Sequence, residues 1–161
     1  MAHAGTGEFG VVDGPGRSAV FAHPSALVLV QQTLYVLEAG SSALRTISLQ
    51  HNHVDTLVGQ GVYEFGDQDG QRREARLQSP QAMVLDAEVA QLWIADTYNG
   101  TLRKLKLGGG DIRTQSLPQS LHEPCGLAAT HGSLWISDGW THDVFRYHID
   151  SGLLQRVPVG E

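Results

Sequence analysis

The stretch Leu92-Trp-Ile-Ala-Asp-Thr-Tyr-Asn-Gly-Thr-Leu-Arg103 decides the fold. It holds an apolar strand that ends in an acid, a short polar turn, and the start of a second strand. The same order recurs at residues 34–49 and 134–149. Each copy is preceded by a strand that begins at a proline and is followed by a fourth strand, with the prolines at Pro24, Pro80 and Pro124 and the fourth strands at residues 54–58, 112–117 and 153–157. Four short strands per copy, repeated three times, predict an all-β protein of three four-stranded antiparallel β-propeller blades.

The predicted domain organisation is one partial propeller over residues 1–161. Its blades cover about 24–58, 80–117 and 124–157, with an inter-blade connection at 1–23 and a long connection at 59–79. The two connections are alike, because Asp13-Gly14 stands eleven residues before Pro24 as Asp69-Gly70 stands eleven before Pro80. We therefore expect the chain to begin just past the last strand of a further blade.

The order of proline, apolar strand, acid, Asn-containing turn and Leu-Arg-Lys resembles the NHL repeat, a family of β-propellers that usually close with six blades. The resemblance covers nearly the whole chain and implies half of a six-bladed ring. The connection from Gly59 to Pro80 is similar to the propeller half of thioredoxin-like proteins that carry NHL repeats. The chain has no Cys-x-x-Cys, so redox chemistry of the thioredoxin type would belong to another domain. Glu38 departs from the family's pattern by replacing the usual Asp.

Composition excludes several function classes. The net charge of -6 repels phosphate backbones, so no nucleic acid is expected as a partner. No apolar run reaches the length that spans a bilayer, so no membrane association is expected. The single cysteine, Cys125, cannot form an internal disulfide, and it is expected to be a buried small hydrophobe. A cytoplasmic location is the expectation.

The turn after the second strand of each blade shares one rim with the connections between blades, because successive strands run antiparallel. Loops on a rigid scaffold commonly carry recognition groups. The candidate binding residues on this rim are Tyr98, Asn99, Trp140, His142 and Asp143. Tyr98 and Trp140 each stand two residues after the strand-ending acid, and the two could form a contact platform or simply pack between turns.

Glu38, Asp96 and Asp138 end the second strands and are interpreted as structural turn acids. Such acids accept hydrogen bonds from the turn's own backbone, and an arginine of the third strand is expected to screen them. The candidates for that role are Arg45, Arg103 and Arg146. The eight histidines form no metal-binding motif, and the sequence predicts no metal site, no cofactor and no catalytic residue.

Three readings of the function remain open. The favoured one is a non-catalytic interaction or scaffold module that binds a protein partner through its rim loops. The alternatives are a propeller enzyme of lyase or hydrolase type with a metal in its channel, or the accessory half of a thioredoxin-like redox protein. Three blades also fall short of a closed ring, so a second copy (3+3) or the blades of a longer chain are expected to complete it.

Overall fold

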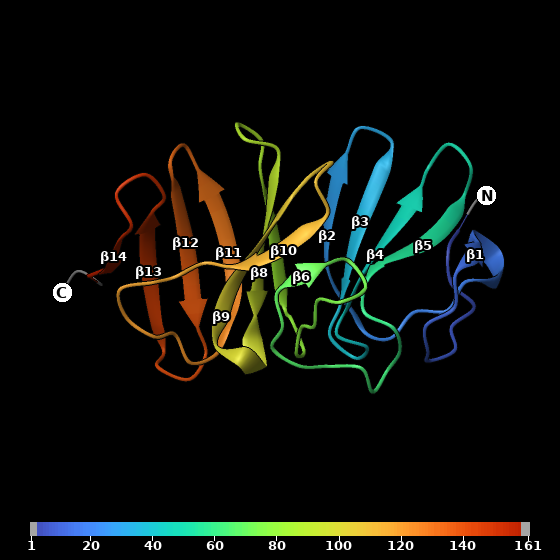
Figure 1. Cartoon of the computed structure of the whole chain (residues 1–161), viewed down its shortest axis with the longest axis horizontal. Coiled ribbons are helices and arrows are strands. Elements are labelled where there is room, and N and C mark those ends of the chain that lie inside the picture. Colours follow the sequence, from blue (N-terminus) through green and yellow to red (C-terminus); the bar gives the residue numbers. More distant parts are fainter. Residues whose placement is uncertain (1–2, 159–161) are drawn as a thin grey trace.

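Three antiparallel sheets stand side by side in an arc (Figure 1), as described by the computed structural model for residues 3–158. The ends of the predicted partial propeller, residues 1–2 and 159–161, lie outside the described residues. The first sheet contains β2 (Pro24–Val30), β3 (Thr33–Glu38), β4 (Ala43–Ser48) and β5 (His53–Val58). The second contains β7 (Ala82–Asp86), β8 (Gln91–Asp96), β9 (Thr101–Lys106) and β10 (Asp111–Thr114). The third contains β11 (Pro124–Thr130), β12 (Ser133–Asp138), β13 (Asp143–His148) and β14 (Leu153–Arg156). The predicted all-β, blade-type fold is confirmed.

Two of the sheets have a fifth strand that the sequence did not predict. β1 (Gly14–Pro15) pairs with β5, and β6 (Gly70–Gln71) pairs with β10. Both short strands belong to the connection that precedes the sheet, so each connection joins the outer edge of the blade that follows it. Over residues 3–158, the third sheet has four strands, and β14 forms its outer edge.

The turn after the second strand ends in a left-handed residue in all three sheets. Ser42, Gly100 and His142 stand four residues after the acid and have φ values of 55°, 66° and 59°. This left-handed conformation suits glycine best. The dipeptide Asn-Gly is typical of a type I′ turn, but Asn99-Gly100 does not form one. Residues Thr97–Asn99 form a 3₁₀ turn, and only Gly100 is left-handed.

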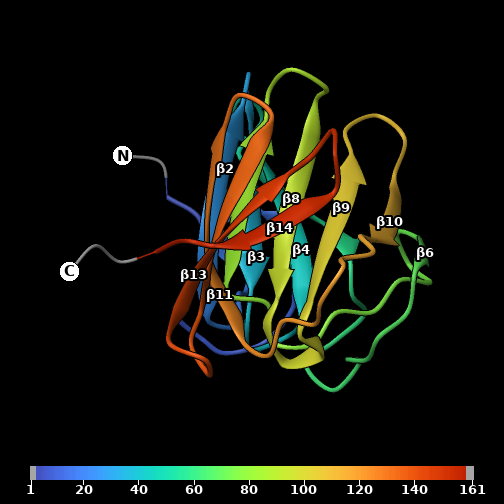
Figure 2. The ribbon, with the colours of Figure 1, turned by 90° about the vertical axis from the view of Figure 1, so that its left-hand side faces the viewer.

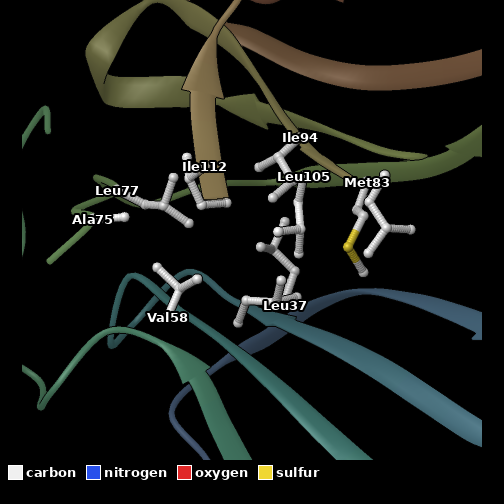
Figure 3. Close-up of a cluster of buried hydrophobic side chains, with 10 residues drawn as sticks. Leu37, Val58, Ala75, Leu77, Met83, Ile94, Leu105 and Ile112 are labelled. Atoms are coloured by element: carbon white, nitrogen blue, oxygen red, sulfur yellow. The ribbon is translucent and has the colours of Figure 1, made fainter. Parts of the chain in front are cut away.

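Apolar side chains fill the space between successive sheets. Between the first two sheets, Leu37 and Val58 face Ile94 and Ile112, and Leu77 of the connection closes the outer side (Figure 3). Between the second and third sheets, the corresponding set is Trp93, Leu102, Leu134, Ile136, Phe145 and Tyr147. Burying such a side chain contributes about 1.5–3 kcal/mol, so these two interfaces hold the arc together.

The outer faces of the first and third sheets have no sheet against them within residues 3–158. Figure 2 views the arc from the third sheet, whose free face carries Trp135. Trp135 has the same register as Trp93, which is 1% exposed because the third sheet covers it, whereas Trp135 is only half-buried. The free face of the first sheet forms an open apolar groove of about 400 Å³ lined by Phe21, Leu34, Ile47 and their neighbours.

Helical structure is confined to two 3₁₀ turns in the described part of the chain. Neither turn has the length or the apolar content that crossing a membrane requires.

Candidate protein-binding rim

One rim of the arc collects the turns after β3, β8 and β12 together with the connection at residues 59–69. These segments lie along the lower edge in Figure 1. The opposite rim carries the plainer hairpin turns at residues 31–32, 87–90 and 131–132. We call the lower edge the connection rim.

A buried arginine fixes the connection rim of the second sheet. Arg103 is fully buried, and its Nη1 donates to Oδ2 of Asp96 at 2.8 Å and to the carbonyl of Arg76 at 3.0 Å. Its Nη2 donates to Oδ1 of Asp69 and to the carbonyl of Gln68, both at 2.8 Å. The guanidinium thus ties the connection to the blade that it precedes, because its several rigid donors reach both segments at once.

The first sheet repeats this arrangement with Arg45. Its guanidinium donates to Glu38 and Asp13, both at 2.9 Å, and to the carbonyls of Val12 and Val20. Asp13 also accepts from the backbone and hydroxyl of Thr56, so it caps β5 as well. A glutamate therefore serves here in the place that an aspartate takes in the second sheet.

Burial has the largest effect on the pKa values of the two acids beside these arginines. It raises the pKa of Asp96 above the ordinary value of an aspartate, although the Gln78 amide, Asn99 and Arg103 oppose the shift. It likewise raises the pKa of Glu38, against the Ser41 hydroxyl and Arg45. Because the arginine charges are permanent and themselves buried, removing either partner would leave an unpaired group in the interior.

The third sheet satisfies its acid differently. Oδ2 of Asp138 accepts from the backbone N–H of His122 at 2.7 Å, and Oδ1 accepts from three further N–H groups. Burial alone would raise the pKa of Asp138, but the four N–H groups outweigh it and hold that pKa below the usual range. The expected screening by Arg146 is wrong, because Phe145 occupies the register of Arg45 and Arg103. Arg146 instead lies over the ring of Trp135 at 5.2 Å.

The predicted binding residues occupy two neighbouring turns of the connection rim. Tyr98 and Trp140 are 65% and 68% exposed. No ring contact joins them among residues 3–158, so they do not pack against each other. The two turns are linked through the chain between them, since Gly100 lies against the backbone of Leu121 and His122, and His122 donates to Asp138.

Of the other three predicted binding residues, Asn99 and Asp143 make polar contacts, whereas His142 is exposed. Asn99 donates its side-chain amide to Asp96 at 2.8 Å and to the carbonyl of Gly66 at 2.7 Å, so it holds the turn to the connection. His142 is exposed at the left-handed position of its turn. Asp143 forms an ion pair with Arg156 of β14.

Three more exposed aromatic residues, which the sequence interpretation missed, lie on the same rim. Phe9, Tyr63 and Phe65 are 58%, 87% and 54% exposed. Phe9 lies beside Gly40 in the turn after β3, and Phe65 precedes Gly66, which accepts the Asn99 hydrogen bond. The sequence feature that could have indicated two of them is the repeated Glu-Phe-Gly at residues 8–10 and 64–66.

Cys125 is exposed, so the prediction of a buried thiol is wrong. The β11–β12 register shifts between Pro124 and Gly126, and this irregularity turns the side chain outward at the start of the innermost strand. Over residues 3–158, no three His, Cys, Asp or Glu side chains gather in a way that could hold a metal ion.

Comparison with known proteins places this arc among propellers. No family model matches the chain. NHL repeat-containing protein 2 of Homo sapiens is 30% identical over 167 aligned residues, and that of Bos taurus is 37% identical. Both alignments cover 89% of this chain, but the chain spans only 23% of the length of these relatives.

The solved structure of virginiamycin B lyase from Staphylococcus aureus superposes with a TM-score of 0.59 at 12% identity, covering 86% of this chain and 42% of the lyase. At this identity the likeness concerns the fold alone. Together with the three sheets and the repeated connections, these findings show that the chain is a β-propeller module similar to NHL repeat-containing proteins.

Proposed function

We propose that this chain is a protein-interaction module whose partner binds across the connection rim. One observation carries the proposal. Among residues 3–158, five aromatic side chains are exposed, and all five lie on this rim: Phe9, Tyr63, Phe65, Tyr98 and Trp140. Exposed aromatic residues on a rigid surface supply large contact area with little loss of side-chain entropy, and they are enriched at protein interfaces.

The scaffold supports this role. The buried Arg103 and Arg45 fix the connection that carries Phe65 and the one that carries Phe9. Asn99 binds the connection to the turn that carries Tyr98. A partner would therefore meet a largely preformed surface, which lowers the entropic cost of binding.

Substitution of two rim aromatics tests the proposal. We expect Tyr98→Ala and Trp140→Ala together to reduce the amount of partner captured by the immobilised chain about tenfold or more, since interface aromatics commonly contribute 1–2 kcal/mol or more each. Val89→Ala, an exposed apolar change on the opposite rim, is the control. Circular dichroism should stay unchanged in all variants. Equal capture of the partner by the wild type and the double variant would refute the proposal that the partner binds across the connection rim.

We also propose that a second copy of the chain covers the two free faces and completes a 3+3 ring. Trp135 on one free face repeats the register of Trp93, which rests on Tyr147 of the next sheet. Leu34 and Ile47, on the other free face, repeat the register of Leu134 and Tyr147. The contact between copies would thus reuse the packing already present between the second and third sheets.

Light scattering of the purified chain tests this ring. We expect a dimer that Trp135→Ala or Leu34→Asp weakens. A mixture of the two variants should regain partial dimer, because one of its two interfaces is then wild type. A stable soluble monomer would contradict the second copy and favour blades of a longer chain as the cover. A cytoplasmic location is part of the proposal, supported by the free and exposed thiol of Cys125.

A further inference from the structure

Each of the three sheets is associated with an exposed acidic residue and an exposed aromatic residue on the same part of the connection rim, and we call each such set an acid–aromatic couple. Glu8 precedes Phe9, and Glu64 precedes Phe65, at corresponding positions of the two connections. The correspondence is structural, because Gly10 donates to the carbonyl of Phe21 as Gly66 donates to that of Leu77, 56 residues later. Both glutamates and both rings are exposed.

The third blade builds the same couple from different segments. Glu123 lies in the stretch before β11, and its Oε2 would be 3.8 Å from a β-carbon placed on Gly139. Trp140 follows Gly139, and the backbone N–H of Gly139 donates to the carbonyl of Glu123 at 2.9 Å. The carboxylate and the indole therefore belong to one local surface, although 17 positions separate them in the chain.

The charges of these couples are largely available. Glu8 and Glu123 form no ion pair with any residue from 3 to 158, and Glu64 meets Arg76 only at 3.7 Å. Asp67, on the same connection, is also exposed, but its carboxylate pairs with Arg103 at 3.3 Å. The lysines lie elsewhere, since Lys106 ends β9 at the opposite rim.

A carboxylate beside an aromatic ring matches a guanidinium or an ammonium group, which can stack on the ring while it pairs with the acid. We propose, building on the protein-binding role above, that the partner presents an extended basic segment whose arginine or lysine side chains each occupy one acid–aromatic couple. An acidic segment would be repelled by the same carboxylates, and so would an RNA backbone.

Fluorescence anisotropy with a labelled Gly-Ser-Arg repeat peptide tests this assignment. We expect the chain to bind it, and to bind it roughly ten- to a hundredfold more weakly when Glu8, Glu64 and Glu123 are all changed to Gln, at about threefold or more per couple. A matched triple variant on the opposite rim, Asp86→Asn with Glu88→Gln and Asp150→Asn, changes the net charge equally and should bind within about twofold of the wild type.

Phe9→Leu combined with Phe65→Leu separates the ring from the charge and should weaken binding about three- to tenfold. Equal losses in the two triple variants, equal binding of a Gly-Ser-Glu repeat peptide or a single-stranded RNA, or no binding of the Gly-Ser-Arg peptide would each overturn the assignment. If partner capture still depends on Tyr98 and Trp140 in that case, only the basic character of the partner is refuted, and the rim keeps its proposed role.

Discussion

Removing the guanidinium of Arg103 should destabilise the second blade more than any surface change. Arg103→Met keeps much of the aliphatic volume but deletes five hydrogen bonds, which link Asp96, Asp67, Asp69 and two backbone carbonyls. Asp96 is fully buried and would lose its charge partner. Breaking a buried ion pair from one side costs about 3–5 kcal/mol.

Urea unfolding followed by circular dichroism measures this cost. With a slope of about 2 kcal/mol/M, the midpoint should fall by about 1.5–2.5 M. Arg113→Met is the matched control, because Arg113 is 60% exposed and pairs with Asp111 at the surface, where such pairs contribute about 0–1 kcal/mol. The cost of Arg103→Met should also shrink toward pH 4, since burial raises the pKa of Asp96 and the protonated acid needs no counter-charge.

A double-mutant cycle measures the interaction energy between Arg103 and Asp96 separately from the effect of each single substitution. Asp96→Asn combined with Arg103→Met should cost about 1–3 kcal/mol less than the sum of the single changes, because neither variant group is then a buried unpaired charge. If Arg103→Met costs no more than Arg113→Met, or if the two changes simply add, the buried arginine does not tie the connection to the blade.

Three further outcomes follow from single sites. Asp138→Asn should cost about 1–3 kcal/mol at pH 7 by urea unfolding. Because the folded-state pKa of Asp138 is lowered, its advantage over the variant is complete above the unfolded value of about 3.9 and is lost as the pH falls from there through the lower folded-state pKa. A difference that stays constant with pH would contradict this. Gly59→Ala should cost at least about 1 kcal/mol more than Gly108→Ala, since both have positive φ but only at Gly59 would the new carbon lie 2.9 Å from Ala43; equal losses would refute the clash. Cys125 should react with a maleimide in the folded chain, and labelling seen only in urea would show that the thiol is buried.

The regular strands could be predicted from sequence because their signal is local. Each blade alternates apolar strands with acid-led polar turns, and this pattern depends on neighbours within about ten residues. The position of Tyr98 and Trp140 on one rim followed from the same pattern, since antiparallel strands fix the side of each turn.

The remaining features depend on contacts between distant segments. β1 and β6 have two residues each and no apolar pattern, and they exist because Asp13 and Asp69 cap the outer strand and bind a buried arginine. The role of Arg146 was misassigned because it stands eight residues after Asp138, whereas Arg45 and Arg103 stand seven after their acids, so Phe145 takes the corresponding register. The exposed Cys125 lies at a strand irregularity that no local sequence pattern predicts.

Each connection is attached to the sheet that follows it and not to the sheet that precedes it. The cooperative folding unit therefore begins at the start of a connection. Residues 59–79 are held by Arg103 and by β10, so they should open and close with the second blade during hydrogen exchange. A fragment cut before Gly59 would keep its stabilising segment, whereas a cut just before Pro80 would strip Arg103 of most of its acceptors. Engineering by truncation, circular permutation or domain insertion should therefore take the start of a connection, and not the first strand of a blade, as the boundary.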